Sequence, residues 1–179
     1  RGSLARAAFE AFPSNDDNDL LARTLVGVMM GFLPTVDGNL RSTLNEWLED
    51  RSFWELQNRY VAHPGPHAFA RAQDVIDGPL RRSMQLRPVP EMVWRTAVRA
   101  HRLGPLEVRR DDLVVVGLVS ATHQDLDHGV TDASLVFGGD RRTDPCPSHA
   151  CPGATMALGV MLGVLAALME VGPLRPTPV

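Results

Sequence analysis

The chain has 179 residues, of which 44% are hydrophobic and 22% are charged. This length and balance suit one compact domain with a single core, and they exclude a disordered or fibrous chain. All 18 positive charges are arginines, and 21 acidic residues leave a formal net charge of -3. Nucleic-acid phosphates are bound by proteins with a clear basic excess, so we expect no nucleic-acid partner.

The cysteine content and the apolar runs indicate the compartment. Two cysteines are too few for a disulfide framework, and no cationic stretch leads into an apolar run at the N-terminus. We therefore expect a reducing, cytoplasmic environment. The longest apolar run, Ala154 to Met169, falls short of the roughly 18 residues that indicate a membrane-spanning helix. We interpret it as a buried core helix and expect no membrane span.

The first predicted element is a long helix over residues 20–50, preceded by a polar N-terminal segment, residues 1–19. Asn18 or Asp19 is suited to cap its start. Its first half is nearly all apolar, which is typical of a helix buried on every side. Pro34 then removes a backbone donor at a cost of about 3 kcal/mol, so we expect a kink or an opening there. Such a break indicates either a site or an incidental kink of a core helix.

Shorter elements follow the long helix. Helical patterns cover residues 53–60, 68–76 and 79–86. The β-branched run Leu113 to Val119 predicts a buried strand, and residues 109–112 are expected to join it to a weaker strand at Leu106 to Val108. Residues 123–147 are rich in Asp, Gly, Thr, Pro and Ser and predict a long irregular loop. The fold class expected is mainly α with a small β element.

The chemically richest stretch is Cys-Pro-Ser-His-Ala-Cys-Pro-Gly, residues 146–153, directly before the apolar helix. A thiolate at a helix N-terminus lies at the positive end of the helix dipole, near free backbone N–H groups, and this favours metal ligation. Cys151 is therefore the candidate metal ligand. Three other interpretations remain open for these residues: a buried structural thiol, part of a zinc site with Cys146 and His149, or a Cys146–Cys151 disulfide.

This stretch resembles the haem-binding loop of the cytochrome P450 family, whose pattern is Phe-Gly-x-Gly-x-His-x-Cys-x-Gly followed by a long buried helix. His149, Cys151 and Gly153 match the last three fixed positions. The resemblance implies that Cys151 is the axial thiolate ligand of a haem b iron, a ligand that favours cleavage of a bound O–O bond. It also implies that His149 lies near a haem propionate and that Gly153 helps to bind the cofactor. Without the resemblance, His149 is simply a cap of the loop.

Other family segments occur in the family's order. Trp94-Arg95-Thr96-Ala97 resembles an Arg-x-Ala segment that leads into a small β-sheet, and Arg95 would then bind a haem propionate through its guanidinium fork. On the residues alone, the alternative for Arg95 is a surface or sheet-edge salt bridge. The helix of residues 79–86 resembles the Glu-x-x-Arg helix, but Arg82 and Gln85 replace the Glu and the Arg. The ion pair of that helix must be reorganised, and Arg141 or Arg142 is the candidate replacement.

The segment around Pro34 resembles the family's distal helix, which crosses the other haem face. Monooxygenases carry an acid followed by an alcohol there, because splitting dioxygen requires delivered protons. Leu33 and Pro34 supply no proton, which is similar to the peroxygenase and hydroperoxide-rearranging branches. By this resemblance Gly31 lies at the cofactor, and Thr35 and Asp37 are the candidate distal polar residues.

The resemblance spans nearly the whole chain but only the C-terminal half of a usual family member. It implies one haem-binding domain or fragment, residues 1–179. Its parts after the distal-type helix are a helix plus small sheet (79–122), the meander and cysteine loop (123–153) and the helix behind the cysteine (154–170). It further implies that a missing N-terminal half or a second chain covers the porphyrin.

The function expected from the resemblance is that of a haem-thiolate oxidoreductase. The altered distal helix favours a peroxide or an organic hydroperoxide as the oxidant, with a small apolar organic substrate. Two alternatives stay open: an electron-fed monooxygenase, and a haem-binding or scaffold module without turnover.

Overall fold

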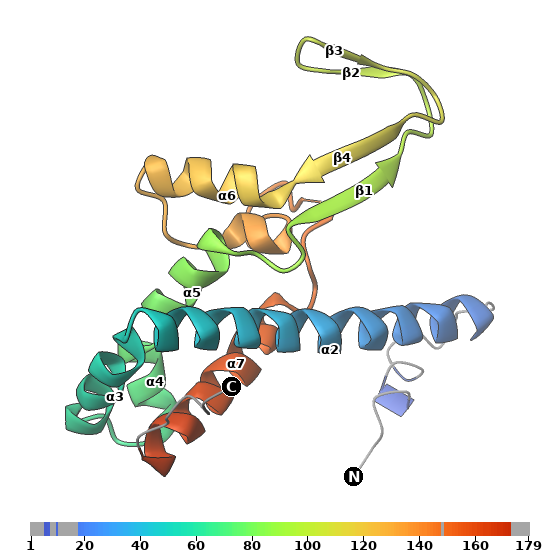
Figure 1. The fold of residues 1–179 in the computed structure, drawn as a ribbon. Coiled ribbons are helices and arrows are strands. Elements are labelled where there is room, and N and C mark those ends of the chain that lie inside the picture. The colour runs from blue at the N-terminus through green and yellow to red at the C-terminus, as the bar shows by residue number, and fades with distance from the viewer. Residues whose placement is uncertain (1–5, 8–9, 11–17, 148, 173–179) are drawn as a thin grey trace, which may run out of the picture. The chain divides into compact units, whose positions relative to one another are not determined.

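The chain divides into two compact units, Arg1–Thr35 and Val36–Val179. The computed structural model describes residues 6–7, 10, 18–147 and 149–172 (Figure 1). Most of the expected N-terminal segment, residues 1–19, therefore lies outside the described residues. The described residues are mainly helical, with a small antiparallel β element, and this confirms the expected fold class at that level.

The first unit contains the N-terminal part of helix α2, Asn18–Glu49, which confirms the long helix predicted over residues 20–50. Asn18 and Asp19 lie in its first turn, so a cap would fall outside the described residues. The helix continues through Pro34, so the predicted opening is not found. The hydroxyl of Thr35 donates to the carbonyls of Gly31 (2.7 Å) and Phe32 (3.1 Å) beside the proline.

The apolar side chains of this part of α2 are exposed. Val26, Met30 and Leu33 are each more than half exposed. The prediction of a helix buried on every side is therefore wrong for the first unit. Composition indicated how apolar the helix is, but the described part of the first unit offers little besides α2 itself to cover it.

The core of the second unit is helical. It contains α3 (Ser52–Ala62), α4 (Ala68–Val75), α5 (Asp77–Leu86) and α7 (Ala154–Val171), all within two residues of the predicted bounds. Helix α7 packs against α3 and α4, and α4 packs against α5. The largest fully buried side chains of these helices and their connection are Phe53, Tyr60, Ile76, Leu80, Met84, Met161, Leu165 and Met169.

Helix α7 is buried on one face only. Met161 and Leu165 belong to that face, while Met156, Val160 and Val164 form an exposed apolar stripe on the other. The helix has 18 residues with a mean hydropathy of 2.0, long and apolar enough to cross a membrane by these criteria alone, and 33% of it is buried. Core helices of soluble proteins meet the same criteria. The prediction of a buried core helix is confirmed for the face that packs on α3 and α4.

Within the second unit, the last turns of α2 are attached to α5 and to the segment after it. The indole N–H of Trp47, a buried residue, donates to Ser83 Oγ of α5 at 2.9 Å. The amide of Asn39 donates to the carbonyl of Val89 at 3.0 Å and accepts from its N–H at 3.3 Å. A Cβ on Gly38 would lie 2.7 Å from Val89 Cγ1, so only a glycine allows this approach without a shift.

Glu46 lies at the same junction, and burial raises its pKa above the ordinary value. The hydrogen bond from Ser83 and the charges of Arg87 and Arg82 oppose this effect. Its Oε2 is buried without a hydrogen-bond partner among the described residues. The folded protein thus holds a proton on Glu46 more readily than the unfolded chain does. Stability is therefore lost as the pH rises from the unfolded pKa to the raised folded pKa.

We expect Glu46→Gln to raise the Tm by about 1–3 °C at about pH 7.5, because the amide removes the cost of a buried charge. The gain should disappear at about pH 3.5, where the carboxyl is protonated in both states. Thermal unfolding at the two pH values measures this difference, with the exposed Glu49→Gln as the control. A gain that is equal at both pH values would contradict the explanation.

The strands form one interrupted ribbon. β1 (Met92–Thr96) pairs antiparallel with β4 (Leu113–Gly117), and β2 (His101–Leu103) pairs with β3 (Leu106–Val108) in the same register. The N–H of Ala97 donates to the carbonyl of Asp112 at 2.9 Å between the two pairs. Residues 109–112 connect β3 to β4 as predicted, but these strands are not partners, since each pairs across the ribbon.

The predicted strand and loop boundaries are wrong after Gly117. Residues expected to end the strand and begin an irregular loop form helix α6, Leu118–Asp127, and a 3₁₀ turn, η1, covers Ser134–Phe137. The hydroxyl of Thr122, fully buried, donates to the carbonyl of Gln85 at 2.7 Å. This contact between α6 and α5 is a tertiary interaction that overrides the β-branched local pattern.

Candidate functional site

Cys151 lies between η1 and the start of α7. It is partly buried, and its backbone N–H donates to the carbonyl of Phe137 at 2.7 Å. Its own carbonyl accepts from the N–H of Ala154 in the first turn of α7 at 3.4 Å. Cys146 is exposed, and both thiols are free, so the Cys146–Cys151 disulfide is not formed. The backbone of Cys151 is thus fixed on both sides.

Two glycines allow the segment after η1 to approach the cysteine loop. Gly138 has φ +76°, and a Cβ there would lie 2.8 Å from the carbonyl oxygen of His149. Gly139 has φ +116°, and its Cβ would lie 2.9 Å from Pro147 Cγ. Only glycine combines a left-handed backbone with this close approach. The loop that carries Cys151 is therefore packed against a turn that cannot accept side chains.

One of two neighbouring arginines is bonded to the cysteine loop. Arg141 donates from Nη1 to the carbonyl of the buried Ala150 at 2.8 Å, directly before Cys151. Arg142 instead pairs with Asp140, with Nη2 2.8 Å from Oδ2. Of the two arginines considered as replacements for the missing ion pair, Arg141 is the one bonded to the cysteine loop.

Helix α5 forms an uncharged hydrogen bond at Gln85. Gln85 is fully buried, and its Nε2 donates to the carbonyl of Val130 at 2.9 Å. Arg81, one turn earlier, pairs with Asp77 (2.7 Å) and donates from Nη1 to the carbonyl of Asp132 (2.9 Å). Helix α5 is thus bound to the segment that leads into η1.

A cavity of about 360 Å³ lies against the cysteine loop. Its walls come from α4, α5, the segment around η1 and the first turns of α7. The charged lining residues are Asp77, Arg81, Asp132, Asp140, Arg141 and Arg142; the apolar ones include Phe69, Phe137, Leu158 and Leu162; Ser134, Cys151, Pro152, Ala154, Thr155 and Gly159 also line it.

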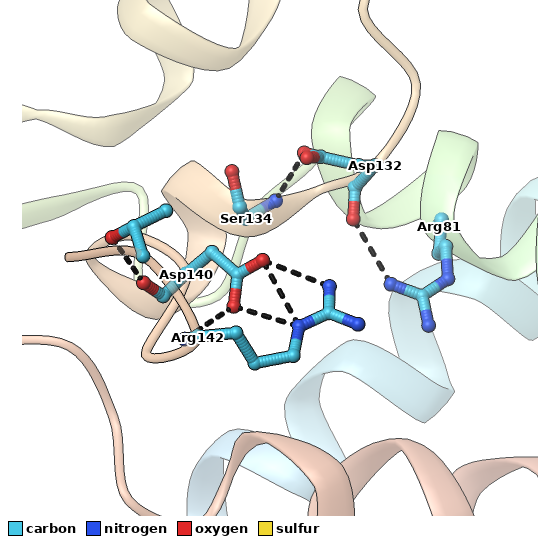
Figure 2. Close-up of polar contacts among 6 residues, drawn as sticks. Arg81, Asp132, Ser134, Asp140 and Arg142 are labelled. Atoms are coloured by element: carbon cyan, nitrogen blue, oxygen red, sulfur yellow. Dashed lines mark hydrogen bonds and ion pairs between the residues drawn. The ribbon is translucent and has the colours of Figure 1, made fainter. Parts of the chain in front are cut away.

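Figure 2 shows the polar groups on the charged side of this cavity. Arg142 Nε contacts both carboxylate oxygens of Asp140, at 3.0 and 3.1 Å. This guanidinium lowers the pKa of Asp140, and the carboxylate in turn raises the pKa of Arg142. Asp132 Oδ1 accepts the backbone N–H of Ser134 at 2.8 Å. The side chain of Arg142 is 90% exposed, so this pair lies at the mouth of the cavity.

Of the residues predicted for the site, Cys151 lines the cavity, whereas Arg95, His149, Gly153 and Asp37 do not. Arg95 is exposed on β1 and donates to the carbonyl of the preceding residue at 2.8 Å. His149 is exposed in its turn. Gly153 is the N-cap residue of α7, with φ -90° and ψ 3°.

The polar side chains predicted on the distal helix, Thr35 and Asp37, bond to groups of their own helix, α2. Thr35 donates to carbonyls of its own helix, as described above. Asp37 is exposed and pairs with Arg41, with Oδ2 2.8 Å from Nε. A Cβ on Gly31 would meet nothing within 4 Å, so no close approach requires a glycine there.

The sequence patterns did not predict the polar residues of the cavity on α5 and before η1. The spacing of Asp77 and Arg81, four residues apart on a helix, is a signal for the ion pair that forms. The Asp132-Ala-Ser134 sequence is a signal for the turn in which Asp132 caps the backbone of Ser134. Neither signal indicates that the Asp77–Arg81 ion pair and the Asp132–Ser134 turn line one cavity.

In residues 18–147 and 149–172, no group of three or more His, Cys, Asp or Glu side chains is placed to hold a metal ion. A structural zinc site requires four protein ligands. Cys146, His149 and Cys151 thus lack the companions of a zinc site among the described residues. A comparison with models of known protein families gives no match, and neither does a comparison with curated proteins.

Proposed function

We propose that this chain is the haem-binding part of a haem-thiolate oxidoreductase, similar to the C-terminal half of a cytochrome P450, with Cys151 as the iron ligand. The observation that carries the proposal is a free, partly buried thiol on a loop bound to the Phe137 carbonyl, directly before an 18-residue helix. In haem-thiolate proteins, the haem iron takes a single Cys thiolate as its proximal protein ligand. The residues present fit this requirement.

The order of the elements supports the proposal. A long helix with an internal proline is followed by the short helices α3, α4 and α5, a β-ribbon carrying Arg95, helix α6, the turn η1, the cysteine loop and α7. This is the order that the resemblance in sequence implies for the distal helix, the Glu-x-x-Arg helix, the small sheet and the cysteine loop. In place of the family's ion pair, the bond from Arg141 to Ala150 would hold the cysteine loop, and the bond from Gln85 to Val130 would hold α5 to the segment before η1.

The oxidant we propose is a peroxide or an organic hydroperoxide. With a thiolate ligand, a bound haem supplies iron chemistry that cleaves an O–O bond. Dioxygen additionally requires proton delivery. Pro34 has no N–H, Thr35 directs its hydroxyl proton to a helix carbonyl, and Asp37 is an ion-pair partner of Arg41. A substrate peroxide brings its own activated bond and does not need these groups to supply protons.

An electron-fed monooxygenase is the alternative within the same chemistry. Turnover of a small apolar substrate with hydrogen peroxide alone would support the proposed peroxide chemistry. Turnover that requires dioxygen and an electron donor would favour the alternative. Bound haem without turnover by either route would favour a haem-binding or scaffold module, which the replaced Glu-x-x-Arg pair also favours. In each case, a missing N-terminal half or a second chain is proposed to complete the cover of the porphyrin.

The iron ligand is tested by absorption spectroscopy of the haem-loaded protein. We expect the reduced protein with carbon monoxide to show the long-wavelength Soret band of thiolate haem. Cys151→Ala should lose this band completely, while the exposed Cys146→Ala should keep it. Persistence of the band in Cys151→Ala would overturn the assignment of the ligand.

A further inference from the structure

The cavity beside the cysteine loop has unused hydrogen-bond donors. Arg81 and Arg142 line its charged side, and Figure 2 shows their guanidinium groups turned toward one another. Arg81 uses Nε and Nη1, and Arg142 uses Nε and Nη2, for the bonds given above. Arg81 Nη2 and Arg142 Nη1 have no acceptor within the described part of the chain. Two guanidinium edges are therefore available to one ligand.

The carboxylates of the cavity are already engaged in its wall. Asp77 accepts from Arg81, Asp140 accepts from Arg142, and Asp132 accepts from a backbone N–H. Arg141 lines the same cavity and takes part in no ion pair in the described ranges. Three arginines and three aspartates balance in formal charge. The bonds given above leave Asp77 Oδ1 and Asp132 Oδ2 without a donor in the described ranges, so the cavity keeps carboxylate acceptors as well as guanidinium N–H donors.

The first turn of α7 adds to this positive character. Ala154 and Thr155 line the cavity, and the N-cap residue Gly153 provides no side-chain cap. The N-terminus of a helix carries a partial positive charge from its unpaired backbone N–H groups. This partial positive charge comes from the backbone of α7, whereas the arginines lie outside that helix, and both favour an anionic ligand.

The remaining wall of the cavity contains an apolar part beside the uncharged polar residues Gln73, Ser134 and Thr155. Phe69 of α4 and Leu158 and Leu162 of α7 line it, and Gly159 leaves open space, because a Cβ there would meet nothing within 4 Å. The volume of about 360 Å³ falls in the range of small-molecule sites, roughly 300–1,000 Å³. A ligand that matches both sides carries an anionic head and an apolar body.

We propose that this cavity binds a small amphipathic carboxylic acid, with its carboxylate between Arg81 and Arg142 and its apolar body against Phe69, Leu158 and Leu162. A carboxylate there would accept from Arg81 Nη2 and Arg142 Nη1, the two nitrogens that have no acceptor in the described ranges, and such charge-assisted hydrogen bonds are stronger than neutral ones. Cys151 lines the same cavity, but the proposed acid site uses neither its thiol nor a bound haem, so it goes beyond the proposed oxidoreductase function.

The probe for this site is 4-fluorobenzoate, titrated into the full 179-residue chain and followed by fluorine NMR. We expect Arg142→Gln, an exposed position at the mouth, and Arg81→Gln each to raise the Kd at least fivefold. The neutral analogue 4-fluorobenzyl alcohol should bind at least tenfold more weakly than the acid. Equal binding of acid and alcohol, or an unchanged Kd in Arg142→Gln, would overturn the proposal.

A matched pair on α7 tests the location. Gly159→Leu should fill the cavity and abolish binding of the probe, while Gly163→Leu, one turn later and outside the cavity lining, should leave the Kd unchanged. Both positions have open space for a Cβ, and both substitutions raise helix propensity, so the fold is retained in each. Binding that survives Gly159→Leu places the probe elsewhere and refutes the site. The titration is carried out without haem, so its outcome is distinguishable from a failure of the haem proposal.

Discussion

Gly138→Ala is expected to lower the free energy of unfolding by about 3 kcal/mol. One part of this loss comes from the backbone, because an L side chain at φ +76° is strained. The other part comes from the new Cβ, which would lie 2.8 Å from the carbonyl oxygen of His149. A backbone carbonyl cannot rotate away as a flexible side chain can, so the turn after η1 must separate from the cysteine loop.

Gly129→Ala is the matched control for this prediction. Gly129 has φ +77°, almost the same backbone strain, but a Cβ there would meet nothing within 4 Å. It should lose only about 1 kcal/mol, and the difference between the two variants isolates the close approach to His149. Urea unfolding measures both free energies. Equal losses would mean that the turn and the loop are not in contact.

The same variant has a consequence for Cys151. Its backbone N–H is bonded to the carbonyl of Phe137, the residue directly before Gly138. Separation of the turn from the loop should therefore expose the thiol. In a Cys146→Ser background, the rate at which a thiol reagent labels Cys151 under native conditions should rise in Gly138→Ala and stay unchanged in Gly129→Ala.

Local sequence patterns were sufficient for most of the helices. The apolar spacing and the Pro and Gly boundaries place α3, α4, α5 and α7 within two residues, because these signals act within one or two turns. They were not sufficient for α6. Its first two residues, Leu118 and Val119, end the β-branched run that favours a strand locally, and the buried bond from Thr122 to the carbonyl of Gln85 belongs to a contact 37 residues away.

Which faces are buried could be predicted only in part. The first half of α2 and the whole of α7 are both strongly apolar, yet the described structure buries only one face of α7 and leaves Met30 and Leu33 exposed. Hydrophobicity measures how much a segment gains from burial, but it does not identify the surface that covers it. That information lies in the packing of other elements.

The candidate site could likewise be predicted from the sequence only in part. The position of Cys151 before an apolar helix is a local feature, and the sequence predicted it. The cavity depends on Arg81, Asp132 and Arg142, which come from α5 and from the segments before and after η1. Their ion pairs are local or nearly so, but their convergence is set by the packing of α5 on α6 and of α6 on η1, which no short pattern specifies.

Leu165→Ala is expected to lower the free energy of unfolding by about 2–5 kcal/mol, because it removes a fully buried side chain and leaves a cavity. The adjacent Val164, 40% exposed, lies on the other face of α7, and Val164→Ala should lose less than about 1 kcal/mol. Chemical denaturation of the two variants measures the asymmetry. A helix that packs one face on α3 and α4 predicts this difference between neighbouring residues. Similar losses at both positions would show that the stripe of Met156, Val160 and Val164 is also covered in the folded protein, and the assignment of a single buried face to α7 would then fail.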